Sequence, residues 1–206
     1  MIEAFDFSES REPGISEYKM FEVLLAVDHK PLGIPYLRPP DDASSSSYVD
    51  LKENPAGIAT IPELRTWPEL KKTVETINQT ISFKTLGCAE FVYDNKSPKF
   101  RIHAYIDFCF ADIIRNEDQL NLYDLFHRFT GYVATIKPSE DLVLRIEMRR
   151  TAFYKENIAG WCLEYWVLGL GDTQDNARQV PNEGFKILED FIRIEETHIP
   201  SEATNP

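Results

Sequence analysis

Residues 100–110 read Phe-Arg-Ile-His-Ala-Tyr-Ile-Asp-Phe-Cys-Phe, with apolar side chains at every even-numbered position. Successive side chains of a β-strand point to opposite faces of a sheet, so this alternation predicts a long strand with one buried face. The residues before it, 81–94, also have strand composition, and the Asn-Lys-Ser-Pro sequence at 95–98 is typical of a hairpin turn. We therefore expect an antiparallel sheet that covers a core with one face.

A second pair of strand-like segments, 142–154 and 160–170, follows a segment with helical periodicity that ends near residue 135. Asn116 and Gln119 predict a capping box at the start of that helix, and further helices are expected over 67–78 and around 185–192. This order predicts an α+β fold. Its antiparallel sheet would have about four to five strands from two tandem helix–hairpin units, with the helices packed on one face.

Charge and composition divide the chain into three parts. Residues 1–56 hold a predicted N-terminal strand and an irregular arm rich in Pro and Ser, residues 57–194 form the predicted globular domain, and residues 195–206 form an acidic tail that we expect to be flexible. Residues 1–50 carry ten acidic and four basic side chains, and residues 172–206 carry eight and three. The acidity therefore belongs mainly to the two ends of the chain.

The formal net charge of -12 argues against nucleic acid and anionic membranes as partners, because both attract clustered Lys and Arg. The longest apolar run, at residues 23–27, is far shorter than the roughly 20 residues that a membrane-spanning helix needs. Cys88, Cys109 and Cys162 are widely spaced, which is typical of reduced core thiols. We expect a soluble, cytoplasmic protein.

Motifs that would identify a nucleotide cradle or a serine hydrolase, GxxxxGK[ST], GxGxxG and GxSxG, do not occur in the sequence. The four histidines are scattered and form no HExxH pattern. We therefore expect neither a cofactor nor a metal site, and we favour a binding protein over an enzyme.

The candidate site is the face of the sheet that points away from the core. Strand alternation assigns the following residues to it: Arg101, His103, Tyr105, Asp107, Arg145, Glu147, Arg149, Glu164 and Trp166. The same pattern fits an exposed sheet face on which opposite charges stabilise neighbouring strands by about 0.2 to 1 kcal/mol per pair. Both interpretations stay open from the sequence.

Two functions follow from this face. The first is a non-enzymatic protein-binding or adaptor module, in which aromatic residues such as Trp67 and Trp166, with Tyr36 and Tyr48 of the arm, anchor a protein partner or a second copy of the chain. The second is a small-ligand-binding protein or enzyme, in which the arginines hold an anion and His103 or Glu147 moves a proton.

The order of elements over residues 67–194 resembles, in arrangement only, the small acidic chaperones of bacterial secretion systems. Those proteins present a sheet and helix surface to an unfolded partner segment. The sequence lacks the third strand that they place before the middle helix. The resemblance implies a chaperone-like binding module, and it makes a homodimer through a helix or an edge strand reasonable.

Overall fold

The computed structural model describes residues 21–26, 32–34, 49–93, 100–136, 138–153 and 156–198. The strands are β1 (Phe21–Ala26), β2 (Leu32–Ile34), β3 (Phe83–Tyr93), β4 (Phe100–Phe110), β5 (Leu142–Phe153) and β6 (Ile158–Gly171). The helices are η2 (Pro55–Thr60), α1 (Glu63–Thr66), α2 (Pro68–Gln79), η3 (Ile113–Asn116), α3 (Gln119–Thr135) and α4 (Gln174–His198). Within the described residues, no helix is both long enough and apolar enough to cross a membrane.

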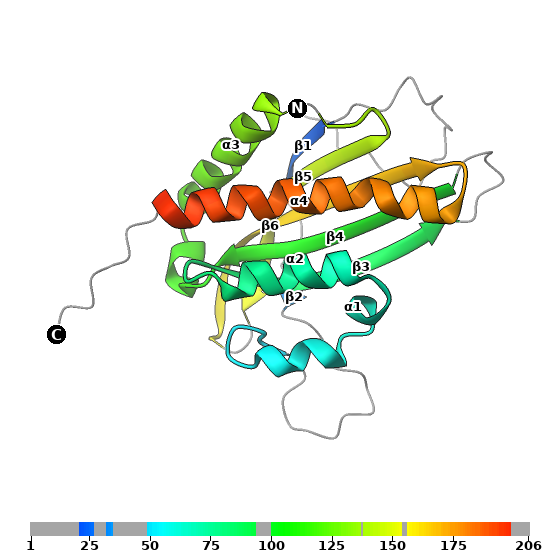
Figure 1. Cartoon of the computed structure of the whole chain (residues 1–206). Coiled ribbons are helices and arrows are strands. Elements are labelled where there is room, and N and C mark those ends of the chain that lie inside the picture. The colour runs from blue at the N-terminus through cyan, green and yellow to red at the C-terminus, as the bar shows by residue number, and fades with distance from the viewer. Residues whose placement is uncertain are drawn as a thin grey trace.

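Strands β5, β6, β4 and β3 are neighbours in that order and pair antiparallel, which confirms the predicted α+β class with an antiparallel sheet. The sheet also has a parallel part, which was not predicted. Both β1 and β2 pair parallel with β5, along its outer edge. The N-terminal strand is therefore an edge strand of the same sheet (Figure 1).

The helices α2, α3 and α4 lie in front of the sheet in Figure 1, and the core fills the space between them and the strands. Helix α4 approaches the sheet closely at Gly184, where an added Cβ would lie 2.6 Å from Cγ1 of Val167. The hydroxyl of Tyr165 donates a hydrogen bond of 2.9 Å to the Gly184 carbonyl. The absence of a side chain at Gly184 and the hydrogen bond from Tyr165 together fix the position of α4 across β6.

Trp67 belongs to this core and is fully buried, so its predicted role as a surface anchor is wrong. Its ring packs edge-on against Phe185, and its Nε1 donates a hydrogen bond of 3.0 Å to Asn182. Both partners come from α4, more than a hundred residues later in the chain. A buried Trp needs an acceptor for its N–H, and local sequence gave no sign of this one.

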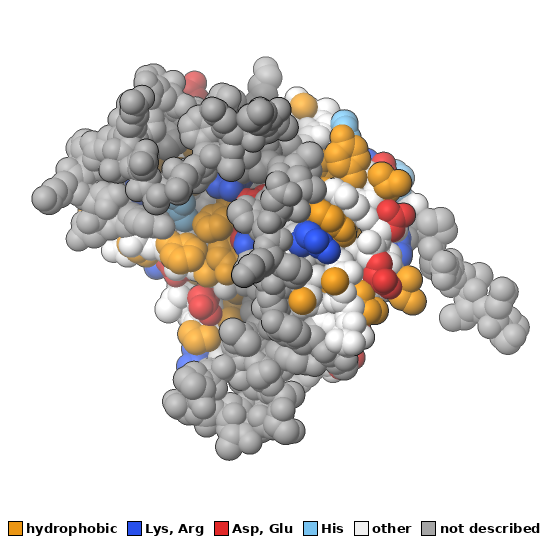
Figure 2. Space-filling view, turned by 180° about the vertical axis from the view of Figure 1, so that it is seen from behind, with side chains coloured by type: hydrophobic (Ala, Val, Ile, Leu, Met, Phe, Trp, Pro, Cys, Tyr) orange, Lys and Arg blue, Asp and Glu red, His pale blue; other side chains and the backbone are white. Residues whose placement is uncertain are grey.

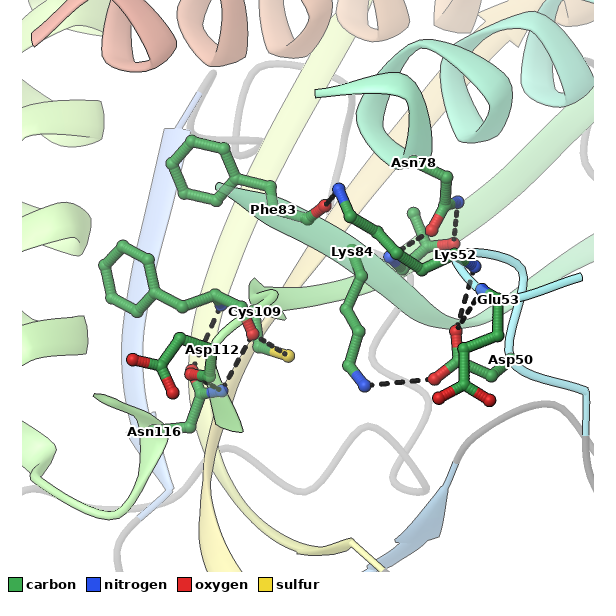
Figure 3. A network of polar contacts seen from close by, with 11 residues as sticks. Asp50, Lys52, Glu53, Asn78, Phe83, Lys84, Cys109, Asp112 and Asn116 are labelled. Carbon is green, nitrogen blue, oxygen red and sulfur yellow. Dashed lines mark hydrogen bonds and ion pairs between the residues drawn. The ribbon is translucent and has the colours of Figure 1, made fainter. Parts of the chain in front are cut away.

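Asn116 does not cap α3 as predicted. Asp118 takes that place and accepts a hydrogen bond from the amide of Leu120. The Asn116 side chain is instead fully buried and pairs with both backbone groups of Phe110, at 3.1 Å from the amide nitrogen and 2.9 Å from the carbonyl oxygen (Figure 3). The pairing of β4 with β6 ends at Phe108, and the Asn116 carboxamide provides the hydrogen bonds to Phe110 in place of a further β6 residue.

Residues 49–53 join the core at the edge of β3. Val49 and Leu51 are buried, and Asp50 forms an ion pair of 3.2 Å with the buried Lys84 of β3. The ammonium of Lys52 donates a hydrogen bond of 2.9 Å to the carbonyl of Phe83 (Figure 3). The predicted domain boundary at residue 57 stays a prediction, but packing against the sheet begins before it.

Candidate binding face

The sheet face opposite the helices carries all the predicted site residues, and Figure 2 views the molecule from that side. On β4, the side chains of Ile102, Ala104 and Ile106 enter the core beneath the helices. Strand alternation therefore turns the odd-numbered residues of β4 to the other side. Hydrophobic side chains gather there beside Lys, Arg and His side chains, as Figure 2 shows. We call this surface the outward face.

Strand register arranges the outward face in rows. Asp107 of β4 lies opposite Glu164 of β6, which in turn lies opposite Glu147 of β5. These three residues are called the carboxylate row below. In the next row, two residues along each strand, Tyr105 lies opposite Trp166, and Trp166 lies opposite Arg145. The sheet thus holds three acids side by side and places aromatic rings next to them.

Three aromatic rings cluster beside the carboxylate row. Tyr105 and Trp166 have ring centroids 4.9 Å apart, and Phe91 of β3 lies 6.2 Å from Tyr105 and 6.0 Å from Trp166. Phe91 is 39% exposed, and the other two rings are half-buried. We call Phe91, Tyr105 and Trp166 the aromatic trio. It forms an apolar surface at the border between core and solvent.

Two of the predicted arginines are paired with carboxylates. Arg145 Nη2 lies 2.7 Å from Glu147 Oε2, and Arg149 forms an ion pair with Glu164. Glu164 and Glu147 are 3% and 7% exposed, so both acids depend on these partners. Arg101 lies six residues from Asp107 along β4, roughly 20 Å at about 3.3 Å per residue. The structure therefore does not bring the three arginines together.

Asp107 is the third acid of the row and is only 7% exposed. Its Oδ1 has no hydrogen-bond partner among the described residues. Burial raises the pKa of this carboxyl to about 8, and the charges of Glu164 and Glu147 act in the same direction against Arg149. Asp107 therefore carries a proton at neutral pH, which is the usual result when carboxyls share a buried site.

A β-bulge creates the space that Asp107 occupies. The β3–β4 register shifts between Thr85 and Gly87, and Gly87 then lies opposite Asp107. A Cβ at Gly87 would stand 2.7 Å from Asp107 Oδ2, so a larger residue there would have to displace the carboxyl group. Bulges often redirect side chains beside functional sites. Sequence reasoning did not find either the bulge or Gly87.

Burial raises the pKa of Glu164, as it does that of Asp107. The positive charge of Arg149 acts in the opposite direction and lowers it. The indole of Trp166 also lowers this pKa, although its buried Nε1 makes no hydrogen bond of acceptable geometry among the described residues. Within the part of the chain that the structure describes, no group of three His, Cys, Asp or Glu side chains is arranged to hold a metal ion.

His103 lies opposite Phe91 of the aromatic trio, two residues before Tyr105 on β4. Burial, helped by the charge of Arg101, lowers its pKa to about 4, so the imidazole is neutral at pH 7. It is four residues from Asp107 along β4, about 13 Å at 3.3 Å per residue. His103 and Asp107 therefore do not form an acid–base pair.

At the end of β4 that contains Cys109, the side chains of the outward face are buried and form a small second core. Cys109 and Cys162 are buried there with Leu86 and Phe153, and Thr151 Oγ1 lies 2.9 Å from Cys162 Sγ. Burial raises the pKa of both thiols. In the sequence, both cysteines alternate on the same side of their strands as the charged residues, and this pattern was the one sign that they belong to the outward face.

Comparison of the chain with protein-family models, with curated proteins and with solved structures finds no match.

Proposed function

We propose that this protein is a non-enzymatic protein-binding module, adaptor or chaperone-like, that holds a segment of a partner protein against the outward face. The aromatic trio carries the proposal: three adjoining rings lie on the side away from the helices, and one of them, Phe91, is 39% exposed. Tyr and Trp supply large contact areas at little cost in conformational entropy, so they are favoured as anchors at protein interfaces.

The alternative, a small anionic ligand held by Arg101, Arg145 and Arg149, has less support. Arg145 and Arg149 are already paired with buried carboxylates. An incoming anion would have to displace Glu147 or Glu164, and a buried acid without its partner costs several kcal/mol. The neutral His103 is also too far along β4 from the carboxylate row to exchange protons with it.

The arrangement of the elements supports the same proposal. We propose that the sheet arises from two tandem helix–hairpin units, α2–β3–β4 and α3–β5–β6, which is the arrangement that resembles secretion chaperones. We place the protein in the cytoplasm as part of this proposal, because its three cysteines are free and buried, as expected in a reducing compartment.

Site-specific photo-crosslinking in the native host tests the proposal. A benzoylphenylalanine at position 91 should crosslink one or a few specific proteins, since this residue is the exposed member of the aromatic trio. The same group at position 120 is the control, because Leu120 is an apolar residue of α3 that is 72% exposed. Crosslinks to a second copy of the chain would identify self-association.

The double variant Phe91→Ala/Trp166→Ala should lose the partner in affinity capture, while Leu120→Ala should keep it. Equal crosslinking from positions 91 and 120, or equal capture by both variants, would show that the outward face is not the binding surface.

A further inference from the structure

We propose that two copies of this chain pair through β3, antiparallel and about a two-fold axis, so that their sheets join at this edge. The pairing adds a second interface and does not require that the outward face holds a partner segment. β3 is the last strand of the sheet on the side opposite β1 (Figure 1), and no described strand pairs with its other side. A strand in this position offers backbone N–H and C=O groups to another strand.

The first half of β3 is protected against such pairing. Residues 49–53 lie against it, where Asp50 pairs with the buried Lys84 and Lys52 donates a hydrogen bond to a β3 carbonyl (Figure 3). The bulge at residues 85–87 follows directly. A covering segment, a buried lysine and a bulge are usual means by which proteins close the edge of a sheet.

The second half of β3, residues 89–93, shows none of these features among the described residues. Its one charged side chain, Glu90, is held on the helix side of the sheet, where it pairs with Arg178 of α4 and accepts a hydrogen bond from Thr66. The other four side chains are uncharged. This half therefore presents an edge on which no charge opposes a second strand.

Exposure on both faces of this half indicates that a neighbouring strand is missing. Val92 points to the helix side, opposite Ile102 of β4, and is 44% exposed, whereas Ile102 is fully buried. Phe91 points to the outward face and is 39% exposed. A binding partner on one face would cover only one of these two side chains. A strand added at the edge would cover both.

A second copy of β3 fits this edge, because an antiparallel strand pair about a two-fold axis normal to the sheet is self-complementary. Centred on Phe91, the pairing places Phe91 opposite its own copy and Val92 opposite Glu90. Aromatic pairs across strands are favourable. Centred on Glu90, the pairing would instead set two carboxylates against each other, so we propose the register centred on Phe91.

The same axis keeps both outward faces on one side of the joined sheet. The two aromatic trios then border each other and form one apolar surface that continues across the dimer. The acidity of the chain lies mainly at its two ends, so it does not concentrate at this contact. Because the paired segment is short, we expect a weak dimer, with a Kd of about 10 to 100 µM.

Sedimentation equilibrium of the full chain, from about 5 to 300 µM, tests the dimer. The unmodified chain should show a monomer–dimer equilibrium. Val92→Glu places a carboxylate opposite Glu90 of the other copy, twice in each dimer, and should weaken dimerisation at least about tenfold. Ile194→Glu is the matched control, because Ile194 lies on α4, is 40% exposed and receives the same charge. It should dimerise as the unmodified chain does.

Introduced cysteines test the register under mild oxidation. Facing residues of antiparallel strands have Cα atoms about 4.5 or 5.5 Å apart, which a disulfide can span. Phe91→Cys should form disulfide-linked dimers with itself, and Glu90→Cys should do so when mixed with Val92→Cys. Neither of the latter two should crosslink alone, nor should the surface control Leu120→Cys. The native cysteines Cys88, Cys109 and Cys162 are buried and do not interfere.

A chain that stays monomeric at about 300 µM would overturn the inference and leave the edge to a strand of another protein. Equal dimerisation of Val92→Glu and Ile194→Glu would place the interface elsewhere, and crosslinking of Glu90→Cys alone would refute the register. The proposed function is decided separately, by whether host proteins crosslink from position 91. Crosslinks between two copies alone would support the dimer and count against the proposed function.

Discussion

Asp107 of β4 and Glu164 of β6 lie directly opposite each other in the sheet, and they are only 7% and 3% exposed. Like charges in such a position destabilise a strand pair. The protein resolves the conflict by pairing Glu164 with Arg149 and leaving Asp107 protonated. The carboxylate row therefore holds a proton that the pH dependence of stability should reveal.

The first prediction concerns stability against pH. The pKa of Asp107 is raised to about 8 in the folded chain, so its proton stabilises the fold at low pH, and this contribution is lost as pH rises through 8. Between the unfolded pKa of about 4 and the folded pKa, one such proton changes the free energy of unfolding by about 1.4 kcal/mol per pH unit at most. Asp107→Asn should remove this decline.

Urea unfolding measured from pH 5.5 to pH 9 checks the prediction. The variant should become more stable than the unmodified chain towards pH 9, whereas Asp124→Asn, at a position of α3 whose side chain is 66% exposed, should follow the unmodified chain at each pH. Parallel curves for Asp107→Asn and the unmodified chain would mean that Asp107 is already ionised in the folded protein.

The second prediction concerns the ion pair between Lys84 and Asp50, whose side chains are 7% and 12% exposed. Lys84→Met leaves the Asp50 carboxylate in a half-buried site without its cation, which should lower the free energy of unfolding by about 3 kcal/mol. Lys71→Met is the control, since Lys71 and Glu75 pair on the surface of α2 with 44% and 42% exposure. It should cost less than about 1 kcal/mol. Equal losses in the two variants would refute the buried pair.

The third prediction concerns Asn116. In Asn116→Asp an acceptor oxygen replaces the Nδ2 that donates to the carbonyls of Phe110 and Asp112, so two acceptors would face each other in a buried site. We expect a loss of about 2 to 3 kcal/mol in chemical denaturation. Asn176→Asp, at an exposed position in the first turn of α4, should be neutral or slightly stabilising. A neutral Asn116→Asp variant would contradict the contacts at Phe110.

The fourth prediction concerns the thiols. Cys109 and Cys162 are fully buried, and burial raises their pKa values, so neither offers a thiolate to reagents. An aromatic disulfide reagent should label these two cysteines only at the rate of unfolding, and complete labelling should appear in 6 M guanidinium chloride. Mass spectrometry of the digested protein assigns the sites. Rapid labelling of either residue in the folded state would place it at an accessible surface.

Much of the fold could be predicted, because one side of the sheet is buried and the alternation of apolar and polar side chains in β4 reflects this burial. The outward positions of Asp107, Glu147 and Glu164 follow from that period of two. Phe91 could not be found in the same way. The bulge at residues 85–87 shifts the phase of β3 by one residue, so that Phe91 points outward, and Glu90 instead reaches Arg178 of α4.

Long-range partners were the other limit. Trp67 was predicted to be exposed because nothing near it in sequence reveals its acceptor, Asn182, which lies 115 residues away. Asn116 was predicted to be a helix cap because local spacing fitted one, whereas its carboxamide bonds to Phe110 on the side of β4 where pairing with β6 has ended at Phe108. The pairing of β1 with β5 is likewise invisible in either segment alone.

That pairing has a consequence for how the chain reaches its native state. Phe21 pairs beside Leu144, so β1 leaves the ribosome long before its partner strand has been made. At about 5 to 20 residues per second, the delay is roughly 6 to 25 seconds. During this interval the apolar β1 has no neighbour, while β3 and β4 can already pair. Nascent chains of this protein should therefore depend on cellular factors that shield the N-terminal strand until translation has passed β5.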